Sequence, residues 1–177
     1  MKNPDHVDTL ISEQQIYQRI KELAGKISEE NPSGNTILVC VLKGAFLFAS
    51  DLCRATSIQV EIDFITASSY SGTKSSGDVK ISAGKPVDYD GKHVVIIEDI
   101  VDTGLTMKKI CEHFEALGVK SVKTAALLSK AAHRKHTVEI DYCGFDIEDN
   151  FVVGYGLDYN QRFRDLPFIG VYKGPVD

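Results

Sequence analysis

Long hydrophobic runs are absent from the 177-residue sequence. The longest one, from Thr36 to Leu42, is interrupted at Lys43 and is far shorter than the roughly 20 apolar residues of a membrane-spanning helix. The opening stretch MKNPDHVDTL also lacks the apolar core of a signal peptide. We therefore expect a cytoplasmic location and no membrane partner.

Positive charge and paired cysteines are also scarce. The chain has 20 Lys and Arg residues against 25 Asp and Glu, a net charge of −5, whereas nucleic-acid-binding proteins usually present a net basic face. Cys40, Cys53, Cys111 and Cys143 lie in separate apolar segments without the paired spacing of a metal site. We expect no nucleic-acid partner, and we interpret the cysteines as small buried side chains in a reducing compartment.

What is present is an alternation of strand-like and helix-like segments in a composition typical of a soluble domain, with 43% hydrophobic and 25% charged residues. The pattern predicts strands over 35–42, 58–67, 94–97, 121–128, 139–147 and 151–157. It predicts helices over 12–30 and 45–55, and a third helix that follows the strand 94–97 and is ended by Gly118. Ser12 and Gln15 have the spacing of a capping box. This order predicts one α/β domain, residues 1–177, with a mainly parallel central sheet flanked by helices.

Residues 68–88 differ from the rest because they are rich in Ser, Gly and Lys and poor in core-forming side chains. A segment of this length with little structure is usually either a functional lid or disordered. The residues alone leave both interpretations open.

The most informative stretch is VVIIEDIVDTGLT, residues 94–106. Its aliphatic run predicts a buried strand that ends in Glu98 and Asp99. In a parallel sheet, ligands lie beyond the carboxyl ends of the strands. Carboxylates at that position suit sugar hydroxyls or a magnesium ion that keeps some of its waters.

The turn that follows suits a phosphate group. Asp102 and Thr103 lead through Gly104 into a helix, whose N-terminus presents unpaired N–H groups and a positive dipole end. Gly104 allows close approach of the backbone, and Thr106 adds a second hydroxyl. The alternative is that these residues merely cap the helix and turn the chain.

At this point the sequence resembles a known family. VVIIEDIVDTGLT is similar to the phosphoribosyl-pyrophosphate signature of type I phosphoribosyltransferases. The segments VLKGAFLFASDL, FITASSYSGTKSSGDVKI, LLSK and FVVGYGLDYNQRFRDLPFIGVY resemble, in that order, the hypoxanthine-guanine phosphoribosyltransferase family, over about residues 37–172. The resemblance implies the type I phosphoribosyltransferase fold, with a mobile lid loop at about 68–88 and a small hood region formed by about 142–177 with a contribution from the N-terminus.

The resemblance also implies an activity. Members of the family move 5-phosphoribosyl from phosphoribosyl pyrophosphate to N9 of hypoxanthine or guanine, which gives IMP or GMP and pyrophosphate in purine salvage. They require Mg2+ and form dimers or tetramers. Two alternatives stay open: a non-catalytic regulator that senses phosphoribosyl pyrophosphate or nucleotides, and a transferase that prefers xanthine.

Roles for individual residues follow from the same resemblance. Asp102 is the implied catalytic residue, placed near N7 of the purine. Glu98 and Asp99 would hold the ribose hydroxyls and one Mg2+, and Asp158 would be a ligand of a second Mg2+. Lys130 would donate to O6 of the base. Taken alone, Asp158 is a turn aspartate and Lys130 is a solvated lysine.

The remaining implied contacts concern the two ends of the substrate pair. Phe151 would stack on the purine and Val152 would offer backbone groups to it, although an aromatic residue at a strand start is usually core. Further implied substrate-binding residues are Lys43, Gly44 and Arg164 at the pyrophosphate, Ser69 and Tyr70 in the lid, and Thr103, Gly104, Leu105 and Thr106 in the phosphate loop. In the family the peptide before Lys43 can be cis, and Arg164 alone is a candidate for a surface salt bridge.

Overall fold

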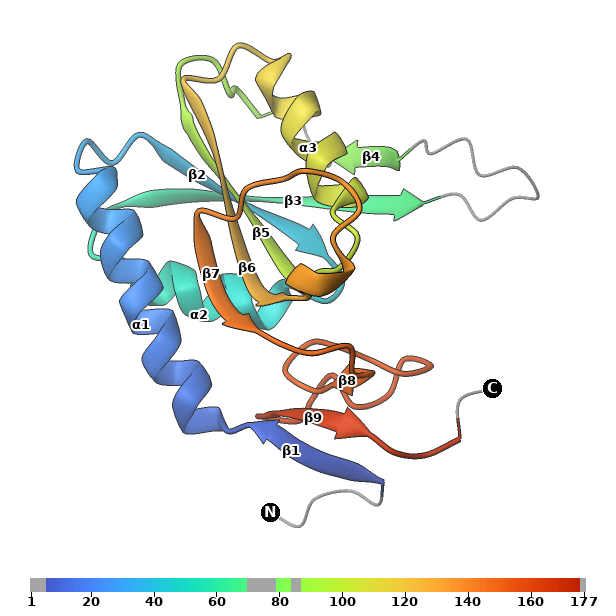
Figure 1. Ribbon diagram of the computed structural model, residues 1–177. Helices are drawn as coiled ribbons and strands as arrows, with labels where there is room; N and C mark the ends of the chain where they lie inside the picture. The colour runs from blue at the N-terminus through green and yellow to red at the C-terminus, as the bar shows by residue number, and fades with distance from the viewer. Residues whose placement is uncertain (1–5, 70–78, 84–86, 176–177) are drawn as a thin grey trace.

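The computed structural model describes residues 6–69, 79–83 and 87–175. The central sheet has the strand order β4-β3-β2-β5-β6-β7, and a small sheet has the order β1-β9-β8 (Figure 1). The central strands are β2 (Thr36–Leu42), β3 (Val60–Ser69), β4 (Val79–Ala83), β5 (His93–Val101), β6 (Ser121–Ser129) and β7 (Tyr142–Asp146). The small sheet contains β1 (Val7–Ile11), β8 (Val152–Val153) and β9 (Ile169–Tyr172).

Five neighbouring strands of the central sheet, β3, β2, β5, β6 and β7, run parallel, and β4 pairs antiparallel with β3. The helices are α1 (Glu13–Glu30), α2 (Phe46–Ala55) and α3 (Leu105–Glu115), with a short 3-10 helix, η1 (Ala131–His133). The predicted α/β class with a mainly parallel sheet is therefore confirmed. None of the helices in the described ranges is long and apolar enough to cross a membrane.

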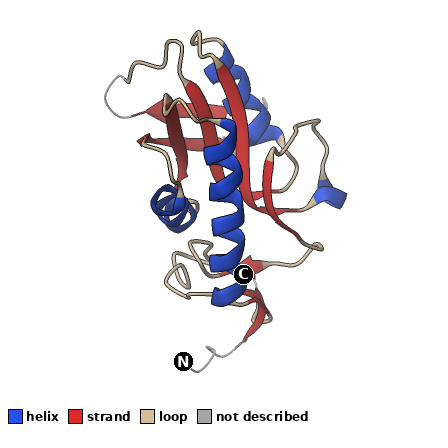
Figure 2. Cartoon of the chain, turned by 90° about the vertical axis from the view of Figure 1, so that its left-hand side faces the viewer, coloured by secondary structure: helices blue, strands red, loops and turns tan. Residues whose placement is uncertain are grey.

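Each face of the sheet has its own core. On one face, Leu38 and Cys40 of β2 pack with α1 and α2; on the other, Ile37 and Val39 pack with α3. Figure 2 shows α1 running along one side of the sheet. Because β2 is central and covered on both faces, its sequence is apolar at successive positions.

Helix α1 begins as the capping-box pattern predicts. The N–H of Gln15 donates to Ser12 Oγ at 3.3 Å, and the N–H of Ser12 donates to Gln15 Oε1 at 2.9 Å. The apolar face predicted for this helix is buried and comprises Ile16, Ile20, Leu23 and Ile27.

The small sheet joins the two ends of the described chain, since β1 pairs antiparallel with β9. It lies beyond the carboxyl ends of the central strands (Figure 1). Two strands of the central sheet lie inside ranges that were predicted to have another role. Strand β7 begins the range 142–177, which was predicted to form the hood, and strand β4 lies within 68–88, which was predicted to form the lid. The hood and the lid remain predictions, and most of the lid lies outside the described residues.

Strand β3 also differs from a fully covered strand. The apolar alternation of Val60, Ile62 and Phe64 does place these residues on one face, but Ile62 is 41% and Phe64 is 44% exposed. The buried residue is Ile65, which packs on the α3 side. Alternation in the sequence therefore identified a face, but it could not say which face the helices cover.

Candidate active site

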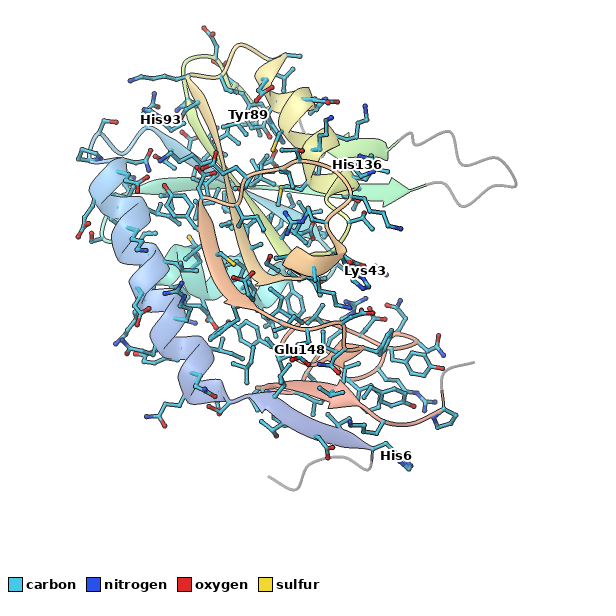
Figure 3. All side chains as sticks on the ribbon, in the orientation of Figure 1. His6, Lys43, Tyr89, His93, His136 and Glu148 are labelled. Atoms are coloured by element: carbon cyan, nitrogen blue, oxygen red, sulfur yellow. The ribbon has the colours of Figure 1, made fainter. Side chains whose placement is uncertain are left out.

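Two adjacent carboxylates lie at the carboxyl end of β5. Glu98 and Asp99 follow the fully buried run Val94–Ile97, so the strand delivers them to the edge of the sheet. The N–H of Ile100 donates to Asp99 Oδ1 at 2.8 Å, which orients that carboxylate. Figure 3 labels Lys43 near this end of the sheet, whereas His93, at the start of β5, lies at the opposite end.

The environment of this pair disfavours two negative charges. Burial raises the pKa of Glu98 well above its ordinary range, and the neighbouring charge of Asp99 raises it further. Burial also raises the pKa of Asp99, while its hydrogen bond with Glu98 acts in the opposite direction. Because a divalent cation would offset the repulsion between two ionised carboxylates, the pair fits a hard ion such as Mg2+.

The protein would supply only part of the coordination of such an ion. Within the described ranges, no three His, Cys, Asp or Glu side chains are grouped as a metal cage. Mg2+ usually keeps several waters and is held by one or two carboxylates plus phosphate oxygens. The carboxylates of Glu98, Asp99 and Asp158 all line one cavity of about 300 Å³, which suits an ion that arrives with a pyrophosphate group.

The phosphate loop forms a second, adjoining cavity of about 100 Å³. It shares Glu98 and Thr106 with the first cavity and adds Asp102, Thr103 and Gly104. Gly104 is the N-cap of α3, with φ +87°, and no side chain in the described residues caps this helix. The N–H groups of its first turn are therefore available to a phosphate.

The loop is held from outside by the segment after η1. The N–H groups of Lys135 and His136 both donate to the carbonyl of Thr103 at 3.0 Å. A Cβ at Gly104 would lie 2.7 Å from Arg134 Cδ and 2.8 Å from the carbonyl oxygen of His136. Glycine is required here both by the positive φ and by this close packing.

Two glycines bring the pyrophosphate side together. A Cβ at Gly44 would overlap the carboxylate of Asp99, and a Cβ at Gly156 would overlap the carbonyl of Gly44. The peptide between Leu42 and Lys43, beside Gly44, is cis. Because Gly44 has no side chain, the backbone of this loop lies directly against the Asp99 carboxylate.

Arg164 extends the positive side of the same cavity. Its Nη1 donates to the carbonyl of Gly156 at 2.6 Å, and its Nη2 lies 2.7 Å from Asp158 Oδ1. Asp158 Oδ2 in turn accepts from the N–H of Gln161 at 2.8 Å. The planar guanidinium is thus fixed by two contacts, and its charge faces the cavity where a pyrophosphate would lie.

The base side lies toward the small sheet. Lys130, only 12% exposed, has its Nζ 3.0 Å from Asp149 Oδ1. Phe151 is 45% exposed and meets the ring of Tyr159 edge-on at 5.7 Å. Val152 is in β8, paired with β9. The open face of Phe151 is consistent with stacking on a planar base.

Most of the residues predicted for the site lie together. Lys43, Gly44, Glu98, Asp99, Thr106, Asp158 and Arg164 line one cavity, Asp102, Thr103 and Gly104 line the adjoining one, and Leu105 begins α3. Ser69 ends β3, with its backbone in register with Val79. Tyr70 lies outside the described residues. The roles of these residues stay predictions.

Sequence reasoning missed two residues on the base side, His133 and Asp149. His133 lies between Asp149 and the predicted proton acceptor Asp102, at 3.0 and 3.4 Å respectively. His133 lies three residues after Lys130, and Asp149 lies two residues before Phe151, both of which the sequence analysis had named. This proximity to predicted site residues was the available signal in the sequence. The contacts themselves could not be predicted, because they join loops that are distant in sequence.

Comparison with known proteins agrees with this geometry. A model of the phosphoribosyl transferase domain matches residues 6–160. The hypoxanthine-guanine phosphoribosyltransferase of Bacillus subtilis is 42% identical over 99% of this chain and 98% of its own length. The hypoxanthine-guanine-xanthine phosphoribosyltransferase of Tritrichomonas foetus is 40% identical over 94% of this chain and 92% of its own length.

A crystal structure of a hypoxanthine-guanine phosphoribosyltransferase from Bacillus anthracis superposes with a TM-score of 0.88. It is 43% identical, and the match covers 93% of this chain and 97% of that one. The parallel central sheet with its flanking helices is therefore the type I phosphoribosyltransferase fold. The chain belongs to the phosphoribosyltransferase family.

Proposed function

We propose that this protein transfers the 5-phosphoribosyl group of phosphoribosyl pyrophosphate to N9 of hypoxanthine or guanine, releasing pyrophosphate and forming IMP or GMP. The observation that supports this most directly is the continuity of the two cavities. A phosphate loop, a half-buried carboxylate pair and a pocket lined by an arginine meet at one edge of the sheet. Their order matches the phosphate, ribose and pyrophosphate of one substrate.

Asp102 is proposed to manage the proton of the base. When N9 attacks C1′ of the ribose, the C1′–O bond to pyrophosphate breaks, and the neutral base must lose the proton on N7. Asp102 is half-exposed at the mouth of the phosphate-loop cavity, with 49% of its side chain accessible, so an incoming base can reach it. A carboxylate within hydrogen-bond reach of N7 can accept that proton.

The carboxylate pair is proposed to stabilise the sugar. Glycosyl transfer passes through an oxocarbenium-like state. In their ionised form, the half-buried carboxylates of Glu98 and Asp99 would stabilise a positive C1′ and orient the ribose hydroxyls. Mg2+, when bound, would neutralise charge on the leaving pyrophosphate. Arg164, held by Asp158 and by the Gly156 carbonyl, would bind the same pyrophosphate group.

Lys130 is proposed to select the base. An ammonium group has donors only, so it matches the O6 acceptor of an oxopurine and not the amino group of adenine. A base without that acceptor would leave a largely buried Lys130 poorly partnered, which penalises the wrong substrate.

A direct assay tests this function. Purified protein with Mg2+ and phosphoribosyl pyrophosphate should release pyrophosphate when hypoxanthine or guanine is added, and no turnover with either base would refute the proposal. Competition among hypoxanthine, guanine and xanthine ranks the bases; turnover of all three would match the bases in the T. foetus relative's name, and a preference for xanthine would favour the alternative transferase. Tight binding of phosphoribosyl pyrophosphate without turnover would favour a regulator, which the names of the relatives do not.

Substitution of the proton acceptor refines the test. Asp102→Asn should lower kcat by about 100-fold or more while changing the KM for phosphoribosyl pyrophosphate far less, because the amide keeps the shape but cannot accept the proton. Asp90→Asn, an exposed carboxylate at the opposite end of β5, is the matched control. Equal losses in kcat and in substrate binding would indicate a structural role for Asp102. Assembly into a dimer or tetramer and a cytoplasmic location stay predictions.

A further inference from the structure

Four polar side chains, two carboxylates, an imidazole and an ammonium group, form a continuous chain on the base side of the site. Asp102 Oδ1 lies 3.4 Å from His133 Nδ1, and His133 Nε2 lies 3.0 Å from Asp149 Oδ2. The other oxygen of Asp149, Oδ1, lies 3.0 Å from Lys130 Nζ. Each nitrogen of the imidazole therefore faces a different carboxylate, and each oxygen of Asp149 has its own cationic or imidazole partner.

The backbone fixes His133 relative to Asp102. The N–H of Lys130 donates to the carbonyl of Val101 at 3.0 Å, directly before Asp102. The N–H of His133 then donates to the carbonyl of Lys130 at 3.0 Å, which closes η1. Together with the bonds from the following residues to Thr103, these contacts tie both sides of η1 to the loop that presents Asp102.

The pairs are too exposed to serve stability. The side chains of His133, Asp102 and Asp149 are 43%, 49% and 58% accessible, and ion pairs at such positions contribute little to the folded state. The hydrogen bond from Lys130, with His133 adding to it, does hold the pKa of Asp149 below its usual range. The chain therefore acts on the orientation and charge of its members more than on folding.

The geometry has a chemical counterpart in the base. N7 and O6 of a 6-oxopurine are neighbours on one edge of the ring system. If Asp102 receives the N7 proton and Lys130 donates to O6, both groups must reach that single edge at a fixed spacing. His133 and Asp149 connect them from behind. Because Oδ1 of Asp102 faces His133, Oδ2 would be the oxygen that faces N7.

We propose that His133 is a positioning residue for phosphoribosyl transfer, which joins the proton acceptor Asp102 to Asp149 and Lys130 so that the two groups reading the N7–O6 edge move as one unit. The inference rests on the proposed function. It assigns separate tasks to the two ring nitrogens: Nδ1 orients Asp102, and Nε2 orients Lys130 through Asp149.

Two conservative variants separate these tasks. The amide nitrogen of asparagine lies close to the position of the imidazole Nδ1, and that of glutamine lies close to Nε2. His133→Ala should lower kcat/KM for hypoxanthine by about fivefold, the effect of one solvent-exposed ion-pair contact of about 1 kcal/mol. His133→Asn should restore kcat, and His133→Gln should restore the KM for the base. His113→Ala, which removes an exposed histidine from the last turn of α3, is the matched control.

The measurements are steady-state kinetics at saturating phosphoribosyl pyrophosphate and a melting curve for each variant. Wild-type turnover is established first, so failure of the proposed function is recognised by an inactive wild type. With an active wild type, the inference is overturned if His133→Ala equals wild type. It is also overturned if kcat and KM worsen together in all three His133 variants, or in step with a lowered melting temperature.

Discussion

Replacement of Gly104 by alanine tests the packing that shapes the phosphate loop. The backbone of Gly104 has φ +87°, a conformation that costs an L-residue about 1–2 kcal/mol. The new Cβ would also lie 2.7 Å from Arg134 Cδ, 2.8 Å from the carbonyl oxygen of His136 and 3.0 Å from Val138 Cγ1. Relief of such contacts by shifts in the backbone adds a further cost of about 1–3 kcal/mol. We expect a total loss of about 3 kcal/mol.

Two other glycines separate the components of that loss. Gly91 has φ +64°, but a Cβ added there would have no atom within 4 Å. Gly91→Ala should therefore lower the free energy of unfolding by about 1–2 kcal/mol, through conformational strain alone. Gly25 lies within α1 with open space around it, so Gly25→Ala should stabilise the protein by about 0.5–1 kcal/mol. Gly104→Ala should therefore be the most destabilised of the three.

Thermal melting and kinetics measure the outcome. For a domain of this length, about 3 kcal/mol lowers Tm by roughly 6–12 °C. Gly104→Ala should also raise the KM for phosphoribosyl pyrophosphate, because movement of Arg134 and His136 displaces the loop that binds phosphate, whereas Gly91→Ala should leave it unchanged. If Gly104→Ala melts no lower than Gly91→Ala and keeps the wild-type KM, the packing assigned to the loop is wrong.

Two further predictions concern pH and metal. Hydrogen bonds from Lys123 and then from Tyr142 hold the pKa of Glu30 below its ordinary range, so the carboxylate stabilises the fold above the pKa of the unfolded chain, and this stabilisation is lost as the pH falls through the lower pKa of the folded state. Glu30→Gln should therefore be less stable than wild type at pH 7, by about 1 kcal/mol or less, and the difference in denaturant titrations should shrink as the pH falls below the ordinary range of a glutamate; a difference that does not change with pH would contradict this prediction. Removal of Mg2+ by a chelator should abolish turnover, and added Mg2+ should restore it, while the melting temperature without substrate stays unchanged; a large drop in melting temperature would instead reveal a structural metal.

The fold class could be predicted because the sequence pattern of the central strands indicates that they are buried on both faces. A parallel strand covered on both faces is apolar at successive positions, and β2 and β5 both have that pattern. Strand β3 shows the limit of this reasoning. Its alternation placed Ile62 and Phe64 on one face, yet that face is partly exposed because α2 packs mainly over β2. The strand that a helix covers depends on where the helix packs, and this position cannot be deduced from the sequence of the strand.

The candidate site divides in the same way. Glu98, Asp99 and Asp102 could be recognised because one strand and one turn present them within a few residues. The contacts between Lys130 and Asp149, and between His133 and Asp102, join different loops. They depend on how η1 lies against the phosphate loop, a tertiary arrangement that short-range spacing cannot reveal.

The glycines explain how distant segments can share one small space. Gly44 lets its loop lie directly against the Asp99 carboxylate, and Gly156 lets the segment before Arg164 lie directly against the Gly44 carbonyl. Arg164 then returns a hydrogen bond to the Gly156 carbonyl. Carboxylate, loop and arginine are thus in contact through backbone atoms, and a side chain at either glycine would have to displace one of them. The opposite charges needed for a phosphorylated sugar stay close together because nothing larger than hydrogen separates the segments that bear them.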